Sequence, residues 1–204
     1  MTHQIVLATH NPHKLHELQR ILAGAGLPYD VIGIDDLPDP SVAPDVKETG
    51  STFEENALLK AHAIAKVTGL PAVADDSGLA VDALHGMPGI LSARWSGRHG
   101  DDKANLDLLL AQLSDVPDER RGAAFHCAAA IALPDGQQRV VVGVMIGRLV
   151  RKPLGNQGFG YDPIFVPEGD TRTNAQLTPD EKDAISHRGH ALRALAPVLS
   201  QLLG

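Results

Sequence analysis

The stretch QIVLATHNPHKLHELQRILAG (residues 4–24) predicts a strand, a tight loop and a helix in succession. Gln4–Ala8 is a short apolar run of the length of a buried strand. Asn11 is a good N-cap, and Pro12 suits the first helical position because its missing N–H is not needed there. Apolar side chains then recur at helical spacing up to a terminating glycine, at Leu15, Leu18, Ile21 and Leu22. This opening is typical of an α/β fold.

The rest of the chain first continues this alternation and then departs from it. We expect a second strand at Tyr29–Ile34, an irregular proline-broken loop at Asp35–Gly50, and a helix from the overlapping capping boxes at Ser51 and Thr52. A short strand, Ala72–Ala74, follows. Two later apolar runs flank Pro134-Asp135-Gly136, a hairpin signal. Because a hairpin interrupts the alternation, the sheet is expected to be mixed rather than purely parallel.

Length, charge and cysteine content exclude several classes of protein. A chain of 204 residues fits one compact unit or two lobes, and its 43% hydrophobic content allows a sizeable core. A net charge of −7 argues against nucleic acid as a partner. Cys127 stands alone, so no disulfide can form within the chain, and no apolar run approaches the roughly 20 residues of a membrane helix. We therefore expect a cytoplasmic protein without a membrane partner.

The loop Thr9–Lys14 is a candidate phosphate site. Backbone N–H groups at a helix N-terminus are unpaired, and the helix dipole favours an anion there. Lys14, one turn inside the helix, could add a cationic contact. The alternative is an ordinary capped turn with a solvent-exposed lysine.

The segment Asp75-Asp76-Ser77-Gly78 is a candidate metal site, since ligands in open α/β sheets bind beyond the carboxyl ends of strands. Adjacent carboxylates repel each other, which favours a bound cation or a raised pKa. In a strand the two would point to opposite faces, so one of them is expected to serve the site. Glu48 is a possible second ligand for Mg²⁺, which needs only one or two carboxylates. The alternative for the aspartates is an Asx turn, and the alternative for Glu48 is a solvated loop charge.

Two further features are candidate binding elements, one for a base and one for an anion. Phe159 lies between two glycines, where an aromatic ring can stack on a base. Lys182, His187 and Arg188 form a cationic patch that would attract an anion. The alternative for Phe159 is an aromatic side chain that fills a turn, and the alternative for the cationic patch is a solvated helix face. The ten histidines include no zinc motif, so zinc is not expected.

The order and spacing of several short motifs resemble the inosine/xanthosine triphosphate pyrophosphatase family over essentially the whole chain. These motifs are Thr9-x-Asn11-x-x-Lys14-x-x-Glu17, Glu48-Thr49-Gly50, Phe53-x-x-Asn56-Ala57, Ala74-Asp75-Asp76-Ser77-Gly78-Leu79, Ser92-Ala93-Arg94, Gly158-Phe159-Gly160-Tyr161-Asp162-Pro163 and Glu181-Lys182-x-x-x-Ser186-His187-Arg188-Gly189.

The resemblance implies a long, mixed, twisted sheet flanked by helices, forming one two-lobed domain over residues 1–204 with the site in the cleft between the lobes. It also implies Mg²⁺-dependent hydrolysis of inosine, deoxyinosine and xanthosine triphosphates to the monophosphate and pyrophosphate, in a homodimer. Asp76 would be the catalytic carboxylate and a metal ligand together with Glu48. Fourteen residues would contact the substrate: Thr9, His10, Asn11, Pro12, His13, Lys14, Ser77, Phe159, Gly160, Tyr161, Asp162, Lys182, His187 and Arg188.

Two alternatives to this activity remain: a phosphatase or pyrophosphatase of broader range that releases orthophosphate, and a nucleotide-binding regulatory module without hydrolysis. One position departs from the expected pattern. His10 stands where a glycine or small polar residue is typical, and a positive φ there would strain the loop.

Overall fold

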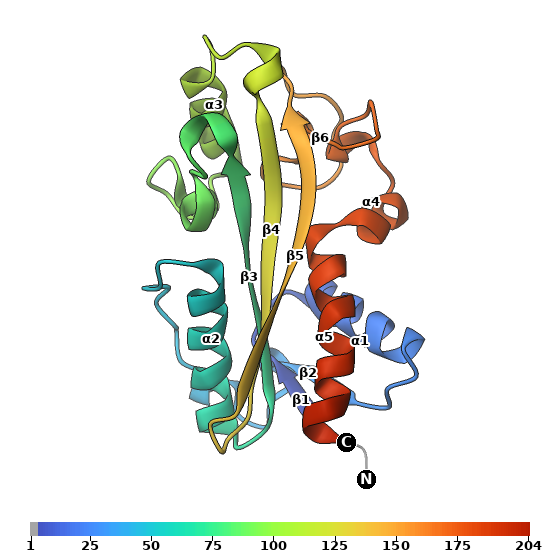
Figure 1. The fold of residues 1–204 in the computed structure, drawn as a ribbon. Coiled ribbons are helices and arrows are strands. Elements are labelled where there is room, and N and C mark those ends of the chain that lie inside the picture. Colours follow the sequence, from blue (N-terminus) through green and yellow to red (C-terminus); the bar gives the residue numbers. More distant parts are fainter. Residues whose placement is uncertain (1–3) are drawn as a thin grey trace. The chain divides into compact units, whose positions relative to one another are not determined.

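The computed structural model describes residues 4–204, which form one six-stranded sheet and five α-helices (Figure 1). The strands run in the order β2-β1-β3-β4-β5-β6 across the sheet. Their bounds are β1 (Gln4–Leu7), β2 (Asp30–Gly33), β3 (Ala72–Val81), β4 (Gly122–Ala132), β5 (Gln138–Leu149) and β6 (Phe165–Pro167). The helices are α1 (Pro12–Gly24), α2 (Phe53–Thr68), α3 (Asp102–Gln112), α4 (Pro179–Ile185) and α5 (His187–Leu203).

The sheet is mixed, as predicted. β1 pairs in parallel with both β2 and β3, whereas β5 and β6 are antiparallel. β4 and β5 are joined by the predicted hairpin turn, in which Leu133 N donates to Gln137 O at 2.8 Å and Gly136 takes a φ of 93°. Both the βα opening and the later hairpin of the sequence are therefore present.

The chain divides into two compact units, and β3, β4 and β5 each contribute to both. Unit 1 contains the described residues up to Asp76 together with Cys127–Gly143 and Arg188–Gly204. Unit 2 contains Ser77–His126 and Val144–His187. The division falls between Asp76 and Ser77, and again between His187 and Arg188. Neighbouring members of two motifs therefore belong to different units.

In unit 1, helices cover both faces of the sheet: α2 lies on one face, and α1 and α5 lie on the other (Figure 1). The alternation of β3 and β4 supplies both interfaces. Val73, Ala129 and Ile131 pack with the α1 and α5 side chains, and Ala72, Ala74, Ala128 and Ala130 pack with those of α2.

Unit 2 has a separate core, in which Leu106 and Leu109 of α3 and the following Leu113 pack with Leu79, Phe125 and Phe165. Arg121 is almost wholly buried at the edge of this core. Its guanidinium donates to the carbonyls of Leu113 at 2.7 Å and Leu149 at 3.0 Å, so it ties the end of α3 to β5.

The predicted strand Ala72–Ala74 was too short, because β3 continues through Asp75 and Asp76 to Val81. The aspartates do not end the strand, since each finds a cationic partner on its own face of the sheet. The proline-broken segment Asp35–Gly50 also carries short 3₁₀ turns, at Ile34–Asp36 and Pro40–Val42, which the sequence did not predict. Across residues 4–204, none of the helices has the length and apolar character needed to cross a membrane.

Candidate active site

The loop between β1 and α1 has the geometry of a capped helix N-terminus. Asn11 Oδ1 accepts a hydrogen bond from His13 N at 2.9 Å, and Asn11 N donates to Thr9 Oγ1 at 3.1 Å. The first turn of α1 carries no acidic side chain of its own, so none within the helix repels an anion at the helix N-terminus. These features confirm the predicted cap and leave the end of α1 suited to a phosphate.

His10 does not strain this loop. Among residues 4–204, His85 is the only non-glycine residue with a positive φ. His10 therefore does not adopt the left-handed conformation that would strain the loop. Its Nδ1 lies 2.8 Å from Asp35 Oδ1, and both side chains are exposed. The departure from the family pattern therefore has no backbone cost.

Asp75 joins two predicted substrate-binding cations. Lys14 Nζ donates to both of its oxygens, at 2.9 and 2.8 Å, and Arg188 Nε donates to Oδ2 at 3.2 Å. Burial alone would raise the pKa of Asp75, but Lys14 and Arg188 outweigh it and hold the pKa well below its usual value. Asp75 is thus an ionised anchor that fixes Lys14 of α1 and Arg188 of α5 relative to each other.

Asp76 lies on the opposite face of β3 and has different partners. Asn56 Nδ2 donates to its Oδ2 at 3.1 Å, and Lys60 Nζ lies 3.4 Å from its Oδ1. Burial raises the pKa of Asp76, the nearby negative charge of Glu48 raises it further, and Lys60 only partly offsets the two. Of the adjacent aspartates, Asp76 is therefore the one suited to accept a proton, as the two-face argument anticipated.

Glu48 and Asp76 share one cation. Lys60 Nζ lies 2.9 Å from Glu48 Oε1 as well as near Asp76, and these carboxylates raise the pKa of Lys60 against the lowering effect of its burial. The space between the two carboxylates therefore already accommodates positive charge. Two carboxylates fit Mg²⁺, which takes its remaining ligands from water and substrate phosphates. Within residues 4–204, no group of three or more His, Cys, Asp or Glu side chains is arranged to hold a metal ion.

Asn56 positions this pair of carboxylates. It is fully buried on α2, donates to Asp76 and accepts a hydrogen bond from Gly50 N at 2.8 Å through Oδ1. A Cβ at Gly50 would lie only 2.7 Å from that oxygen, so the loop that carries Glu48 can approach Asn56 only with glycine there. The family motif contains Asn56, but the sequence did not reveal what it contacts.

In unit 2, the glycine-rich loop exposes an aromatic ring. Phe159 is 66% exposed, and its backbone N donates to Asp162 Oδ2 at 2.9 Å. Gly160 N donates to Asp102 Oδ2 at 2.9 Å, which fixes the other side of the same turn. Tyr161 and Asp162 are buried, and the Tyr161 hydroxyl donates to Ser92 O at 2.9 Å. The loop therefore presents Phe159 to solvent on a backbone that is held from within.

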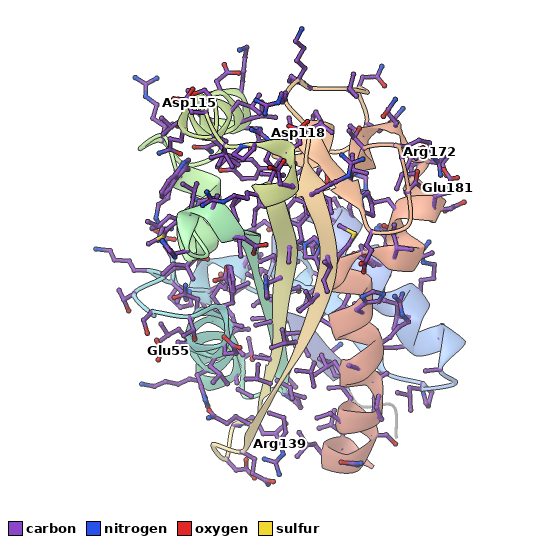
Figure 2. All side chains as sticks on the ribbon, turned by 45° about the horizontal axis from the view of Figure 1, so that its top comes forward. Glu55, Asp115, Asp118, Arg139, Arg172 and Glu181 are labelled. Atoms are coloured by element: carbon purple, nitrogen blue, oxygen red, sulfur yellow. The ribbon has the colours of Figure 1, made fainter. Side chains whose placement is uncertain are left out.

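Lys182 of α4 lies beside that ring. Its Nζ is 5.0 Å from the centre of the Phe159 ring and 2.5 Å from Asp162 Oδ2. The start of α4 is fixed by a capping box between Thr178 and Glu181. Arg172 reaches Glu181 at 3.1 Å, and Figure 2 shows these two side chains next to each other. Phe159, Asp162 and Lys182 thus form one cluster, which the sequence did not predict as a group.

His187, at the first position of α5, stacks on Phe125 of β4. Their ring centres are 4.9 Å apart, with an angle of 13° between the planes. Phe125 also contacts Phe165 of β6, at 4.7 Å between ring centres. The orientation of the His187 ring is therefore set by the aromatic core of unit 2.

Comparison with known proteins gives one consistent family. A sequence profile of the Ham1 family matches residues 5–198. A "dITP/XTP pyrophosphatase" of Streptomyces coelicolor is 66% identical over 201 residues, covering 98% of this chain and 99% of the relative. A crystal structure of "Nucleoside-triphosphatase / dITP/XTP pyrophosphatase" from Mycobacterium abscessus has a TM-score of 0.80 at 59% identity, covering 96% of this chain and 99% of that one. A HAM1 protein structure from Coxiella burnetii has a TM-score of 0.89 at 43% identity, covering 98% and 100%. The resemblance found in the motifs is confirmed, and the chain belongs to the Ham1 family.

Proposed function

We propose that this chain hydrolyses inosine, deoxyinosine and xanthosine triphosphates to the monophosphate and pyrophosphate. Relatives named for dITP and XTP support the substrate class. The observation that carries the chemistry is the pair of the half-buried Glu48 and the buried Asp76, which share one cation and in which Asp76 has a raised pKa. A polyphosphate bound to a cation, next to a carboxylate able to take a proton, is the arrangement that anhydride hydrolysis requires.

The triphosphate would bind at the N-terminus of α1. Pro12 has no N–H, and the N–H groups of Thr9, Asn11 and His13 donate within the protein, so the loop Thr9–Lys14 would offer the backbone N–H groups of His10 and Lys14 as donors. The Lys14 side chain supplies a positive charge whose position is fixed by Asp75. The absence of an acidic residue from the first turn of α1 favours this binding. The backbone would line the triphosphate at His10, Pro12 and His13.

Glu48 and Asp76 would hold Mg²⁺, which would neutralise negative charge on the phosphates when bound. In the hydrolytic step, a water oxygen forms a bond to the α-phosphorus and the bond from that phosphorus to the bridging oxygen breaks. Pyrophosphate leaves with the bonding electron pair, and Asp76 accepts the proton of the water. Ser77, the next residue along β3, would contact the same phosphate.

The base would bind to the second set of residues. Phe159 offers an exposed ring face for stacking, and Lys182, His187 and Arg188 offer hydrogen-bond donors. A 6-keto group accepts such a hydrogen bond, whereas the 6-amino group of adenine cannot. A donor left unpaired against adenine costs about 1–3 kcal/mol, or roughly 5- to 150-fold in selectivity for each contact. Tyr161 and Asp162 are buried and would contribute by fixing the loop.

One chain feature supports the assignment of both residue sets to one nucleotide. Lys14 of the first set and Arg188 of the second both donate hydrogen bonds to Asp75 within unit 1, so the two sets share one carboxylate. A homodimer and a cytoplasmic location belong to the same proposal.

A panel of nucleoside triphosphates, assayed with and without Mg²⁺, tests this function. We expect pyrophosphate release from inosine and xanthosine triphosphates and little from adenosine triphosphate. Orthophosphate as the product would favour a phosphatase of broader range. Tight binding of inosine triphosphate without turnover would favour a regulatory module, and in that case Asp76→Asn would change nothing.

A further inference from the structure

Asn174 is a buried polar residue that the proposed chemistry does not use. It lies in a 3₁₀ turn (Asn174–Gln176), and its side chain has no exposed surface. Its Nδ2 donates to Asp162 Oδ1 at 3.1 Å. Within the part of the chain that the structure describes, its Oδ1 has no hydrogen-bond partner. The unpaired Oδ1 is therefore buried at a cost in stability, and Nδ2 makes a single hydrogen bond, to Asp162.

That contact lies on a carboxylate that organises the predicted base pocket. Asp162 Oδ2 accepts from Phe159 N at 2.9 Å and from Lys182 Nζ at 2.5 Å. Oδ1 faces Asn174 instead. The Asp162 side chain is 5% exposed, so a bound ligand has little access to it. The two oxygens thus have different partners: Oδ2 binds Phe159 N and Lys182 Nζ, which would face a ligand, and Oδ1 accepts the hydrogen bond from Asn174.

The space around Asp162 makes the orientation of its carboxylate important. A Cβ at Gly158 would lie 2.2 Å from Asp162 Oδ2, and Gly158 has a φ of 73°. Only glycine at this position therefore lets the backbone of the loop lie this close to the carboxylate. If the carboxylate rotated, Oδ2 would leave both Phe159 N and Lys182 Nζ.

We propose that Asn174 is a positioning residue for base recognition: through its hydrogen bond to Asp162 Oδ1, it orients the carboxylate that sets Phe159 and Lys182 against a purine base. This inference rests on the proposed function. An apolar side chain of similar size would fill the same space without an unpaired oxygen, so the Nδ2 donor is what the position requires.

The substitution Asn174→Leu removes this donor and keeps most of the volume. Phe159 and Lys182 would contact the base equally in the ground state and the transition state, so their misplacement raises KM and leaves kcat unchanged. We expect KM for inosine triphosphate to rise about fivefold, with kcat within about twofold of the wild type. If Asn174→Leu does not fold, Asn174→Ala removes the same donor with less bulk.

Asn105 provides a matched control. It is buried on α3 in the same unit, and its side chain bonds to the backbone of Ser96 and Ala93 rather than to Asp162. Asn105→Leu should lower the unfolding temperature but leave KM within about twofold of the wild type, because it does not reach the Phe159 and Lys182 cluster. An equal rise in KM in both variants would mean that any buried defect in this unit has the same effect, and it would overturn the proposal.

A double-mutant cycle tests whether Asn174 acts through Asp162. Asp162→Asn removes the charge that Lys182 and Phe159 N share, and it should raise KM by itself. In that background Asn174→Leu should add less than about twofold, because the carboxylate that it orients is gone. Full additivity, or an unchanged KM in the single Asn174 variants, would refute the positioning role. Failure of the proposed function is distinct from either result, because the wild-type protein would then release no pyrophosphate from inosine triphosphate.

Discussion

The carboxylate of Asp75 is the most informative place to perturb the fold and the site together. Asp75→Asn keeps the size of the side chain and removes the negative charge to which Lys14 and Arg188 bind. All three groups are largely shielded from solvent: the side chain of Asp75 is 6% exposed, that of Lys14 25% and that of Arg188 17%. The substitution leaves two cations close together with no neutralising charge between them.

The expected loss follows from this burial. Removal of one partner from a buried ion pair costs about 3–5 kcal/mol, and an asparagine oxygen that still accepts one hydrogen bond places Asp75→Asn near the lower end. For a chain of this length, about 3 kcal/mol corresponds to a fall of roughly 6–12 °C in Tm. Because Lys14 and Arg188 also lose their common anchor, KM for the nucleotide should rise as well.

The pH dependence of the unfolding temperature gives an independent check that the charge of Asp75 stabilises the fold. The folded pKa of Asp75 is lowered below the unfolded value of about 3.9, so its stabilisation is fully present above that value. It is lost as the pH falls through the folded pKa. The difference in Tm between the wild type and Asp75→Asn should therefore be full at neutral pH and shrink below about pH 4.

Thermal unfolding followed by circular dichroism measures both effects. Asp118→Asn is the matched control, since its carboxylate pairs with Arg151 at the surface, where 77% of the Asp118 side chain is exposed. A surface pair contributes little, so this control should leave Tm nearly unchanged. If Asp75→Asn lowered Tm no more than the control, or by the same amount at all pH values, the buried anchor would be refuted.

Three further predictions concern the catalytic pair and the base. Asp76→Asn should abolish turnover and retain nucleotide binding, since it removes the proton acceptor; a rate within about threefold of the wild type, measured as pyrophosphate release, would contradict this. In the metal-free protein Asp76 should titrate above an ordinary aspartate, and Lys60→Met should raise its pKa further because the Lys60 charge lowers it; carboxyl carbon chemical shifts measure both, and an unchanged pKa in the variant would count against the pairing. Phe159→Ala should raise KM for inosine triphosphate by roughly 5- to 150-fold, the value of one lost base stack, with Tm unaffected because the ring is exposed; an unaltered KM would exclude stacking.

Local patterns in the sequence predicted the parts of the fold that local interactions decide. The strand, cap and helix at residues 4–24 follow from apolar periodicity and from Asn11, whose side chain bonds only two residues away. The hairpin around Gly136 is equally local. β3 was predicted too short, because charged residues in a buried strand are unfavourable until distant cations neutralise them. Lys14 and Arg188, which neutralise Asp75, lie 61 and 113 residues away from it in sequence.

The same limit applies to the candidate site. The motifs identified the groups predicted to touch the nucleotide but not the residues that hold them in place. Lys60 reads as one of several polar residues on a helix, and its contact with Glu48 depends on how a proline-broken loop folds back. Asn174 carries no motif signal at all. Only its burial and its bond to Asp162 point to the positioning role that we propose for it.

The proposed reaction is the release of pyrophosphate from inosine, deoxyinosine and xanthosine triphosphates. The most direct test is to quantify the pyrophosphate and nucleoside monophosphate formed from inosine and adenosine triphosphates, in the presence of Mg²⁺, by the wild-type protein. We predict equal amounts of the two products from inosine triphosphate, at an efficiency at least about tenfold above that for adenosine triphosphate. Release of orthophosphate, or equal turnover of the two nucleotides, would contradict the account.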